Sequence, residues 1–329
     1  MSALRCLLFA LLVIVPSAAV GSDKAEFIRP AEIPFPVDNP YNPDKVALGK
    51  ALYFDPRLSG NENMTCATCH NPSFGWEVPV KTAVGAQNTR LGRQAPTVLN
   101  IAWVHPLFWD GRAATAEEQA KGPIQAPAEM NLPLDQAVAR LKAIPAYSKW
   151  FERVFPGEGV TGGGIAKAIA TFERTVVASY SPFDRWIDGD ETAIGEDAKR
   201  GFDLFVSKAR CSTCHSGWNF TDNDFHDIGT TSTDIGRAAI ASGDTKAEFA
   251  FKTPSLRDIA QRAPYMHDGS LATLEDVVQH YVGGGIDRPS RSGKMGPIAL
   301  SESEAANLVA FLRSLTGTKQ VVTLPVLPN

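Results

Sequence analysis

The sequence contains the motif Cys-x-x-Cys-His twice, at residues 66–70 and 211–215. At this spacing two thiols can add to the two vinyl groups of one haem, while the adjacent histidine binds the iron as its proximal ligand. The sequence therefore predicts two covalently bound haem c groups. The residues concerned are Cys66, Cys69 and His70 in the first motif, and Cys211, Cys214 and His215 in the second.

Three other uses of four cysteines compete with haem attachment. They are two disulfides, one four-cysteine zinc site and a thioredoxin-like redox pair. None of them explains why a histidine follows the second cysteine in both motifs.

A second repetition shows how the chain is organised. Residues 96–118 align without a gap on residues 254–276, and nine of the 23 positions are identical. Each half is therefore expected to contain a haem-attachment motif, a proline-led loop, a (Trp or His)-Asp-Gly turn and the start of a helix.

The apolar periodicity predicts an all-α, loop-rich fold of two cytochrome c-like haem domains related by internal duplication. No alternating strand pattern is convincing. Thr115 with Glu118, Thr273 with Asp276 and Ser301 with Glu304 have the spacing of helix N-caps. We expect helices over 43–54, 134–155, 162–180, 195–208 and 302–315. The chain should consist of a signal peptide over 1–22, an N-terminal c-type haem domain over 23–190 and a C-terminal c-type haem domain over 191–329, divided near Asp188 to Ile194.

The N-terminus has the pattern of a secretory signal peptide. Arg5 precedes an apolar run over 7–15 that is shorter than the ~20 residues needed to span a bilayer. We expect cleavage near residue 21, loss of Cys6, a periplasmic location and no membrane anchor in the mature protein.

The composition excludes several classes of protein. Hydrophobic residues make up 44% and charged residues 21% of the 329 residues, which argues against wholesale disorder and against a polytopic membrane protein. The formal net charge of −4 does not suit a nucleic-acid binder, but it could favour encounter with a basic electron-transfer protein.

Three further motifs carry a family resemblance. They are Phe108-Trp109-Asp110-Gly111-Arg112, Gly122-Pro123-Ile124-Gln125 and Tyr265-Met266-His267-Asp268-Gly269. Together with the two haem-attachment motifs, they make the sequence resemble the bacterial di-haem cytochrome c peroxidase and MauG superfamily over about residues 40 to 317. The resemblance implies that the N-terminal haem reacts with hydrogen peroxide, that the C-terminal haem stores or relays an electron, and that a calcium ion lies between them.

The resemblance also assigns the catalytic residues. His70 would be the proximal ligand of the peroxidatic haem, with Gln119 and Glu129 on the distal side, and Trp109 would carry an electron or hole between the haems. A carboxylate suits the distal position, because splitting the O–O bond needs a base that takes a proton from peroxide and returns it to the leaving oxygen. His215 would bind the second iron.

Two departures from the common peroxidase pattern predict a MauG-like protein. Tyr281 stands where most members of the superfamily have a methionine ligand to the second iron, and MauG has tyrosine there. An anionic oxygen ligand favours ferric iron. Met295, His280 and Met266 remain alternative ligands of the second iron. Ala86 stands where many peroxidases have a distal histidine, so the first haem should be open without reductive activation.

The remaining assignments concern the surroundings of the haems. We expect His267 to contact a haem propionate, His226 to support the haem and His105 to be a loop residue. Ala209 replaces the surface tryptophan of MauG, and Trp218 could take its place. By resemblance, calcium would be bound by the side chain of Gln94 and by the backbone carbonyls of Arg262 and Pro264.

The sequence and the resemblance are compatible with three functions. The first is a periplasmic di-haem oxidoreductase that uses hydrogen peroxide to oxidise a partner protein, in the manner of MauG. The second is a peroxidase that detoxifies hydrogen peroxide with electrons from a small cytochrome c or cupredoxin. The third is a non-catalytic di-haem electron carrier.

Overall fold

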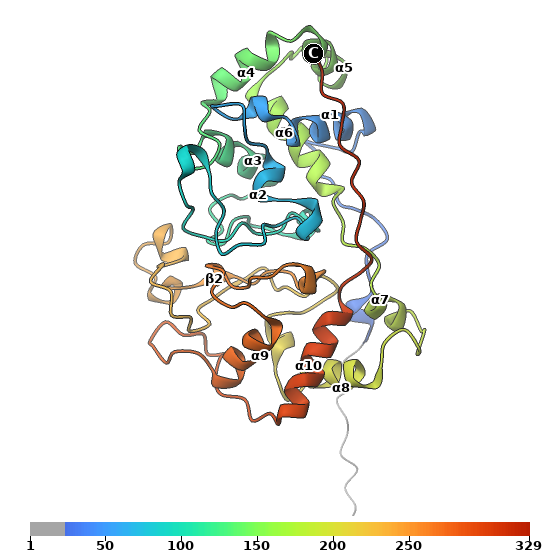
Figure 1. Cartoon of the computed structure of the whole chain (residues 1–329), viewed down its shortest axis with the longest axis vertical. Coiled ribbons are helices and arrows are strands. Elements are labelled where there is room, and N and C mark those ends of the chain that lie inside the picture. Colours follow the sequence, from blue (N-terminus) through green and yellow to red (C-terminus); the bar gives the residue numbers. More distant parts are fainter. Residues whose placement is uncertain (1–23) are drawn as a thin grey trace, which may run out of the picture.

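The chain folds into two helical domains that lie end to end (Figure 1). The structure is a computed structural model and describes residues 24–329, so the predicted signal peptide lies outside the described residues. The helices are α1 (Pro43–Tyr53), α2 (Cys66–Cys69), α3 (Ala116–Gln125), α4 (Leu134–Lys142), α5 (Pro145–Val154), α6 (Gly162–Arg174), α7 (Pro182–Ile187), α8 (Glu196–Val206), α9 (Leu274–Gly283) and α10 (Glu302–Ser314).

The only strands among the described residues are β1 (Phe225–His226) and β2 (Phe251–Lys252), which pair antiparallel. Strands of two residues are too short to produce a detectable alternation in the sequence. The prediction of an all-α, loop-rich fold is confirmed.

A close pair of helices forms the centre of each domain. In the first domain α1 packs on α6, and in the second α8 packs on α10. Both contacts depend on a glycine. A Cβ atom on Gly49 would lie 1.9 Å from the carbonyl oxygen of Ala168, and a Cβ atom on Gly201 would lie 1.9 Å from that of Asn307.

Both ends of the described chain cross to the opposite domain. Phe27 lies in the core of the second domain, although the chain then enters the first domain through α1. The C-terminal tail returns along the first domain, where Gln320 Nε2 donates to Val177 O at 2.8 Å and Val322 packs on the core (Figure 1). The two domains are therefore joined by more than the single linker between them.

The predicted helix starts are confirmed, and two predicted helices are too long. The side chains of Thr115, Thr273 and Ser301 each accept a hydrogen bond from the backbone N–H three residues later. The helix predicted over 134–155 is instead split into α4 and α5, because Pro145 begins a new helix. The helix predicted over 162–180 ends at Arg174, before an extended segment that leads to Pro182.

The internal duplication is also present in the structure. Leu107 bridges to Ala113 in the first repeat, and Tyr265 bridges to Leu271 at the equivalent position of the second. Both loops have a glycine with positive φ inside the bridge, a conformation that L side chains rarely adopt. These are Gly111 at φ 76° and Gly269 at φ 62°.

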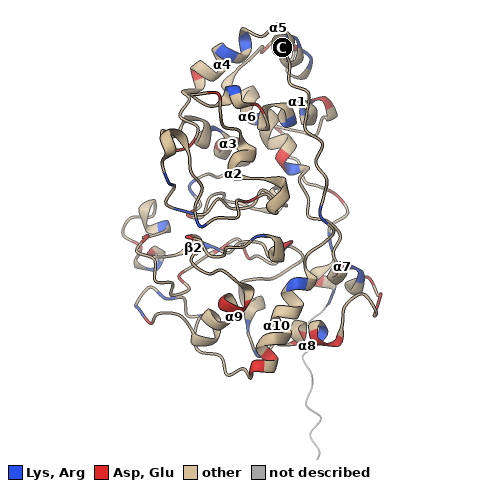
Figure 2. Ribbon diagram, in the orientation of Figure 1, with Lys and Arg blue, Asp and Glu red and all other residues tan. Residues whose placement is uncertain are grey.

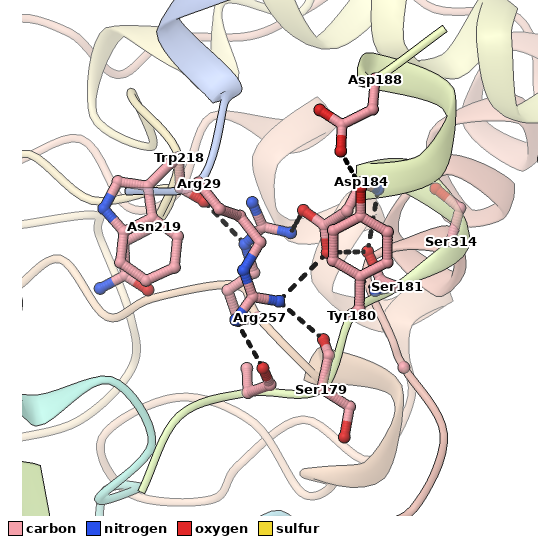
Figure 3. A network of polar contacts seen from close by, with 12 residues as sticks. Arg29, Ser179, Tyr180, Ser181, Asp184, Asp188, Trp218, Asn219, Arg257 and Ser314 are labelled. Carbon is pink, nitrogen blue, oxygen red and sulfur yellow. Dashed lines mark hydrogen bonds and ion pairs between the residues drawn. The ribbon is translucent and has the colours of Figure 1, made fainter. Parts of the chain in front are cut away.

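A buried carboxylate on α7 holds this helix and the N-terminal segment against the second domain (Figure 3). Asp184 Oδ1 accepts from Arg257 Nη1 at 2.6 Å, and Asp184 Oδ2 is 3.3 Å from Arg29 Nη1. The same carboxylate accepts from the backbone and hydroxyl of Ser181, which caps α7. One side chain thus joins three segments that are distant in sequence.

Basic and acidic residues both occur along the chain of each domain (Figure 2). Over residues 24–329, no helix has the length and apolar character needed to cross a membrane.

Candidate active site

Within residues 24–329, a large cavity lies beside the Cys-x-x-Cys-His motif of each domain. The empty space, including the part open to solvent, is about 1600 Å³ in the first domain and about 1590 Å³ in the second. The first cavity is lined by the predicted residues Cys69, His70, Gln119 and Glu129, and the second by Cys211, Cys214, His215, His226, His267 and Tyr281.

The residues around each cavity fit a covalently attached haem. All four cysteines are free thiols, and Cys69 lines the first cavity whereas Cys211 and Cys214 line the second, which argues against a shared four-cysteine zinc site and a disulfide framework within residues 24–329. His215 Nδ1 is 2.9 Å from Phe220 O, which leaves Nε2 for a metal. His70 Nδ1 is buried and has no hydrogen-bond partner among residues 24–329. Burial lowers the pKa of His70 to about 4 and also lowers that of His215, so both imidazoles are neutral, as iron ligands must be.

Five residues line both cavities and so separate one from the other: Gln94, Trp109, Lys252, Pro254 and Arg262. Two of them hold Trp109 in place. The indole Nε1 of Trp109 donates to Gln94 O at 2.9 Å, and Trp109 O accepts from the backbone N–H of Lys252 at 2.8 Å. The predicted bridging tryptophan therefore lies between the two cavities.

The duplicated segments meet at this point with approximate twofold symmetry. Gln94 and Lys252 occupy equivalent positions of the two repeats, as do Trp109 and His267. The Gln94 N–H donates to His267 O at 2.7 Å, in the same way that the Lys252 N–H donates to Trp109 O. The pairing of the repeats thus fixes the wall between the cavities.

Arg93 and Lys252 line these cavities and were not predicted from the sequence. Arg93 lines the first cavity and pairs with Asp110 at 2.7 Å and with Asp234 at 2.6 Å. Lys252 is buried, and its ammonium donates to Pro106 O at 2.7 Å without a carboxylate partner among the described residues. Burial lowers the pKa of Lys252 to about 7. Its position opposite Gln94 in the duplication is a sequence signal that could have identified it.

Glu129 and Gln119, the predicted distal residues, both line the first cavity. Gln119 is on α3, and Glu129 is in the loop that follows this helix. Burial raises the pKa of Glu129 above its usual value, and the nearby Arg112 partly opposes that rise. His70 is the only histidine that lines this cavity within residues 24–329, so no second histidine is in position to close it.

Comparison with known proteins agrees with this geometry. Residues 43–192 match a family described as di-haem cytochrome c peroxidase, and residues 198–316 match one described as cytochrome c. The chain is 52% identical over 308 residues to methylamine utilization protein MauG of Methylorubrum extorquens, covering 93% of this chain and 87% of the relative. The protein belongs to the di-haem cytochrome c peroxidase and MauG family.

Other relatives in this family carry peroxidase names. Cytochrome c551 peroxidase of Nitrosomonas europaea is 36% identical, with 90% of this chain and 86% of the relative covered. A crystal structure of a MauG-like protein associated with microbial copper homeostasis superposes with a TM-score of 0.81 at 31% identity, covering 94% of this chain and 96% of that one. The protein is accordingly a peroxide-dependent di-haem oxidoreductase with two haem c groups.

The second cavity contains the predicted family ligand Tyr281, on α9. Met266 and Met295 line the same cavity, so they remain alternatives. His280 is not among the lining residues, and its Nε2 lies 2.9 Å from Ile228 O. Burial raises the pKa of Tyr281, so a phenolate would form here only beside a strong positive charge such as iron.

The remaining histidines differ in their surroundings. His267 stacks on Phe251 with ring centroids 3.6 Å apart, and its buried Nε2 has no partner within residues 24–329, which suits a contact with a haem propionate. His226 is 2.9 Å from Asp222. Burial alone would lower the pKa of His226, but Asp222, together with the free Cys214 thiol, raises it. His105 is exposed and lines neither cavity.

Ala209 and Trp218, the two residues considered for the role of the MauG surface tryptophan, lie in different surroundings. Ala209 is buried at 3% exposure. Trp218 packs edge-on against Trp103 across the domain boundary, with centroids 4.8 Å apart, and lines neither cavity.

The predicted calcium residues lie together between the domains, but the side chains of Gln94 and Arg262 are both bound to Glu77. Gln94 Nε2 donates to Pro264 O at 3.1 Å and to Glu77 Oε2 at 3.0 Å, and the guanidinium of Arg262 pairs with Glu77 at 2.8 Å. Calcium requires oxygen ligands. Its binding therefore stays a prediction, and it requires the Gln94 amide to turn so that the oxygen faces Pro264.

Proposed function

We propose that this protein reacts with hydrogen peroxide in the first cavity and passes oxidising equivalents through Trp109 and the second cavity to a partner protein. The observation that carries the proposal is the position of Trp109, which lines both cavities and is held at Nε1 and at its backbone oxygen. The haem irons, when bound, supply the peroxide-binding and electron-transfer chemistry.

Glu129 and Gln119 perform the proton chemistry of this reaction. Burial raises the pKa of Glu129, which makes its carboxylate a stronger base and suits a group that both takes and returns a proton. The Gln119 amide lies in the same cavity. Its NH₂ group can donate a hydrogen bond to a peroxide oxygen, and its carbonyl oxygen can accept one from the peroxide O–H.

Tyr281 gives the second cavity its MauG-like character in this proposal. An oxygen ligand stabilises the oxidised second iron, so that site would share an oxidised state with its neighbour rather than store an electron. The 52% identity to a MauG protein supports this assignment.

The partner is a redox protein reached after export. A small cytochrome c, a cupredoxin or a protein substrate all fit the chemistry, and the acidic net charge favours a basic partner. The signal-peptide pattern supports a periplasmic location. The relative named methylamine utilization protein suggests a role in methylamine metabolism. Against this role, Ala209 stands at the position where MauG has a surface tryptophan.

Replacing Glu129 tests the proposal. In Glu129→Gln we expect both haems to be retained and the reaction with hydrogen peroxide, followed by stopped-flow absorbance, to slow by ~10²-fold, the usual contribution of a positioned acid-base group. The control is Glu118→Gln, an exposed carboxylate of α3 that only caps its own helix. If both variants react as fast as the wild-type protein, Glu129 has no role in the reaction.

A second candidate function is detoxification of peroxide, which the relative named cytochrome c551 peroxidase supports. Sustained turnover of hydrogen peroxide with a reduced small cytochrome c would favour this function. Oxidation of a partner protein without such turnover would favour the MauG-like function.

A further inference from the structure

A closed loop of backbone lies against the segment that carries Glu129. Within the loop, Leu91 N donates to Ala83 O at 2.9 Å, Gly85 N donates to Thr89 O at 2.8 Å, and Thr89 N donates to Ala86 O at 3.0 Å. These bonds fold residues 83–91 onto themselves, so the loop can act as a rigid unit.

The loop touches the Glu129 segment through backbone atoms. Ala86 N donates to Glu129 O at 2.8 Å. A Cβ atom on Gly85 would lie 1.9 Å from Ala128 O and 3.0 Å from Glu129 Cα, so the two backbones approach this closely only because residue 85 is glycine. The backbone angles of Gly85, φ −99° and ψ −154°, are accessible to other residues. Glycine is required here by the contact and not by the conformation.

A second glycine supports the same segment at its other end. Gly60 N donates to Met130 O at 2.8 Å, and a Cβ atom on Gly60 would lie 2.5 Å from Asn131 O. Residues 128–131 are therefore held between two backbone contacts, each of which excludes a side chain.

No side-chain hydrogen bond or ion pair within residues 24–329 holds the Glu129 carboxylate, and Arg112 acts on it only through longer-range electrostatics. The position of this carboxylate in the first cavity is consequently set by its backbone. We propose that Gly85 and the 83–91 loop position Glu129 for proton transfer, so that Gly85 is a positioning residue of the peroxide reaction. This inference rests on the proposed role of Glu129.

The holoprotein with Gly85→Ala tests the inference. A displacement of a catalytic group by about 1 Å can cost up to ~10²-fold in rate, so we expect the peroxide reaction of Gly85→Ala to slow by ~10-fold or more. The pH profile of that rate should change as well, because Glu129 would sit in a different environment. Gly163→Ala is the matched control, since a Cβ atom there meets nothing closer than Thr161 Oγ1 at 4.0 Å.

The same substitution in a Glu129→Gln background separates positioning from other effects. If Gly85 acts through Glu129, Gly85→Ala should change the rate of the Glu129→Gln protein by less than twofold. An equal slowing in both backgrounds, or a Gly85→Ala rate equal to that of Gly163→Ala, would overturn the inference. A normal rate for Glu129→Gln alone would refute the proposed function instead.

Gly60→Ala provides a second variant in case Gly85→Ala does not fold with haem. The added Cβ atom contacts the other end of the same segment, at 2.5 Å from Asn131 O compared with 1.9 Å from Ala128 O in Gly85→Ala. We expect the same loss of rate and the same dependence on Glu129, and an unchanged rate and pH profile would contradict the inference.

Discussion

Replacing Asp184 by asparagine should destabilise the protein far more than the loss of an ordinary surface charge. Asp184 is 3% exposed and holds Arg257 at 2.6 Å and Arg29 at 3.3 Å (Figure 3). The asparagine side chain has the same shape and can still accept from Ser181. The change therefore removes the negative charge while leaving the two guanidinium groups in place.

The magnitude follows from the burial of Arg257, which is 1% exposed. Although burial lowers its pKa to about 10, Arg257 remains charged at neutral pH and would lose its carboxylate partner. Removing one partner of a buried pair costs ~3–5 kcal/mol, out of a total stability of ~5–15 kcal/mol. At ~2–4 °C per kcal/mol, this lowers the midpoint of thermal unfolding by about 10 °C.

Thermal unfolding of the holoprotein, followed by circular dichroism, measures this shift. The control is Asp188→Asn, because Asp188 lies at the end of the same helix and its contact with Tyr180 is exposed. We expect the control to change the stability by less than ~0.5 kcal/mol. Equal unfolding midpoints for Asp184→Asn and Asp188→Asn would show that the contacts of Asp184 with Arg257 and Arg29 do not stabilise the fold.

Two further predictions concern the second haem and the effect of pH. Tyr281→Met should raise the potential of the second haem and stabilise its ferrous state, because a thioether replaces an anionic oxygen; an unchanged spectroelectrochemical titration would show that Tyr281 is not the ligand. Burial raises the pKa of Glu173 to about 8, and its Oε2 is unpartnered among residues 24–329. The native state thus binds this proton more tightly than the unfolded chain, and stability should fall as the pH rises from about 4.5 to 8. Glu173→Gln should remove that fall from urea unfolding curves, and a fall of the same size in both proteins would contradict it.

Motifs whose chemistry is local could be predicted from the sequence. The Cys-x-x-Cys-His spacing identified both cavities, and the capping residues Thr115 and Thr273 were confirmed because a cap depends only on residues within one turn. The duplication also predicted equivalent loops in both domains.

Contacts between distant segments could not be predicted in this way. Nothing near Asp184 in the sequence indicates Arg29 or Arg257, and nothing near Gly85 indicates Glu129. The helix pair at the centre of each domain did leave a sequence signal. Gly49 and Gly201 both begin the pattern Gly-x-x-Leu-aromatic in the helix that precedes each haem motif, so this repeat could have indicated both helix contacts.

The predicted helix over 134–155 was wrong for a local reason. Apolar periodicity continues through Ala143 and Ile144, but Pro145 cannot donate the backbone hydrogen bond that would continue the helix. Proline fits the first turn of α5 instead.

In the proposed reaction, an open first haem reacts with peroxide and shares its oxidation with the second haem through Trp109. Electron paramagnetic resonance of the diferric protein, before and after one equivalent of hydrogen peroxide, tests whether the first haem is open and the two haems are oxidised together. We predict one high-spin and one low-spin ferric signal, both lost on addition of peroxide without prior reduction. Two low-spin signals that peroxide does not change would contradict the proposed reaction.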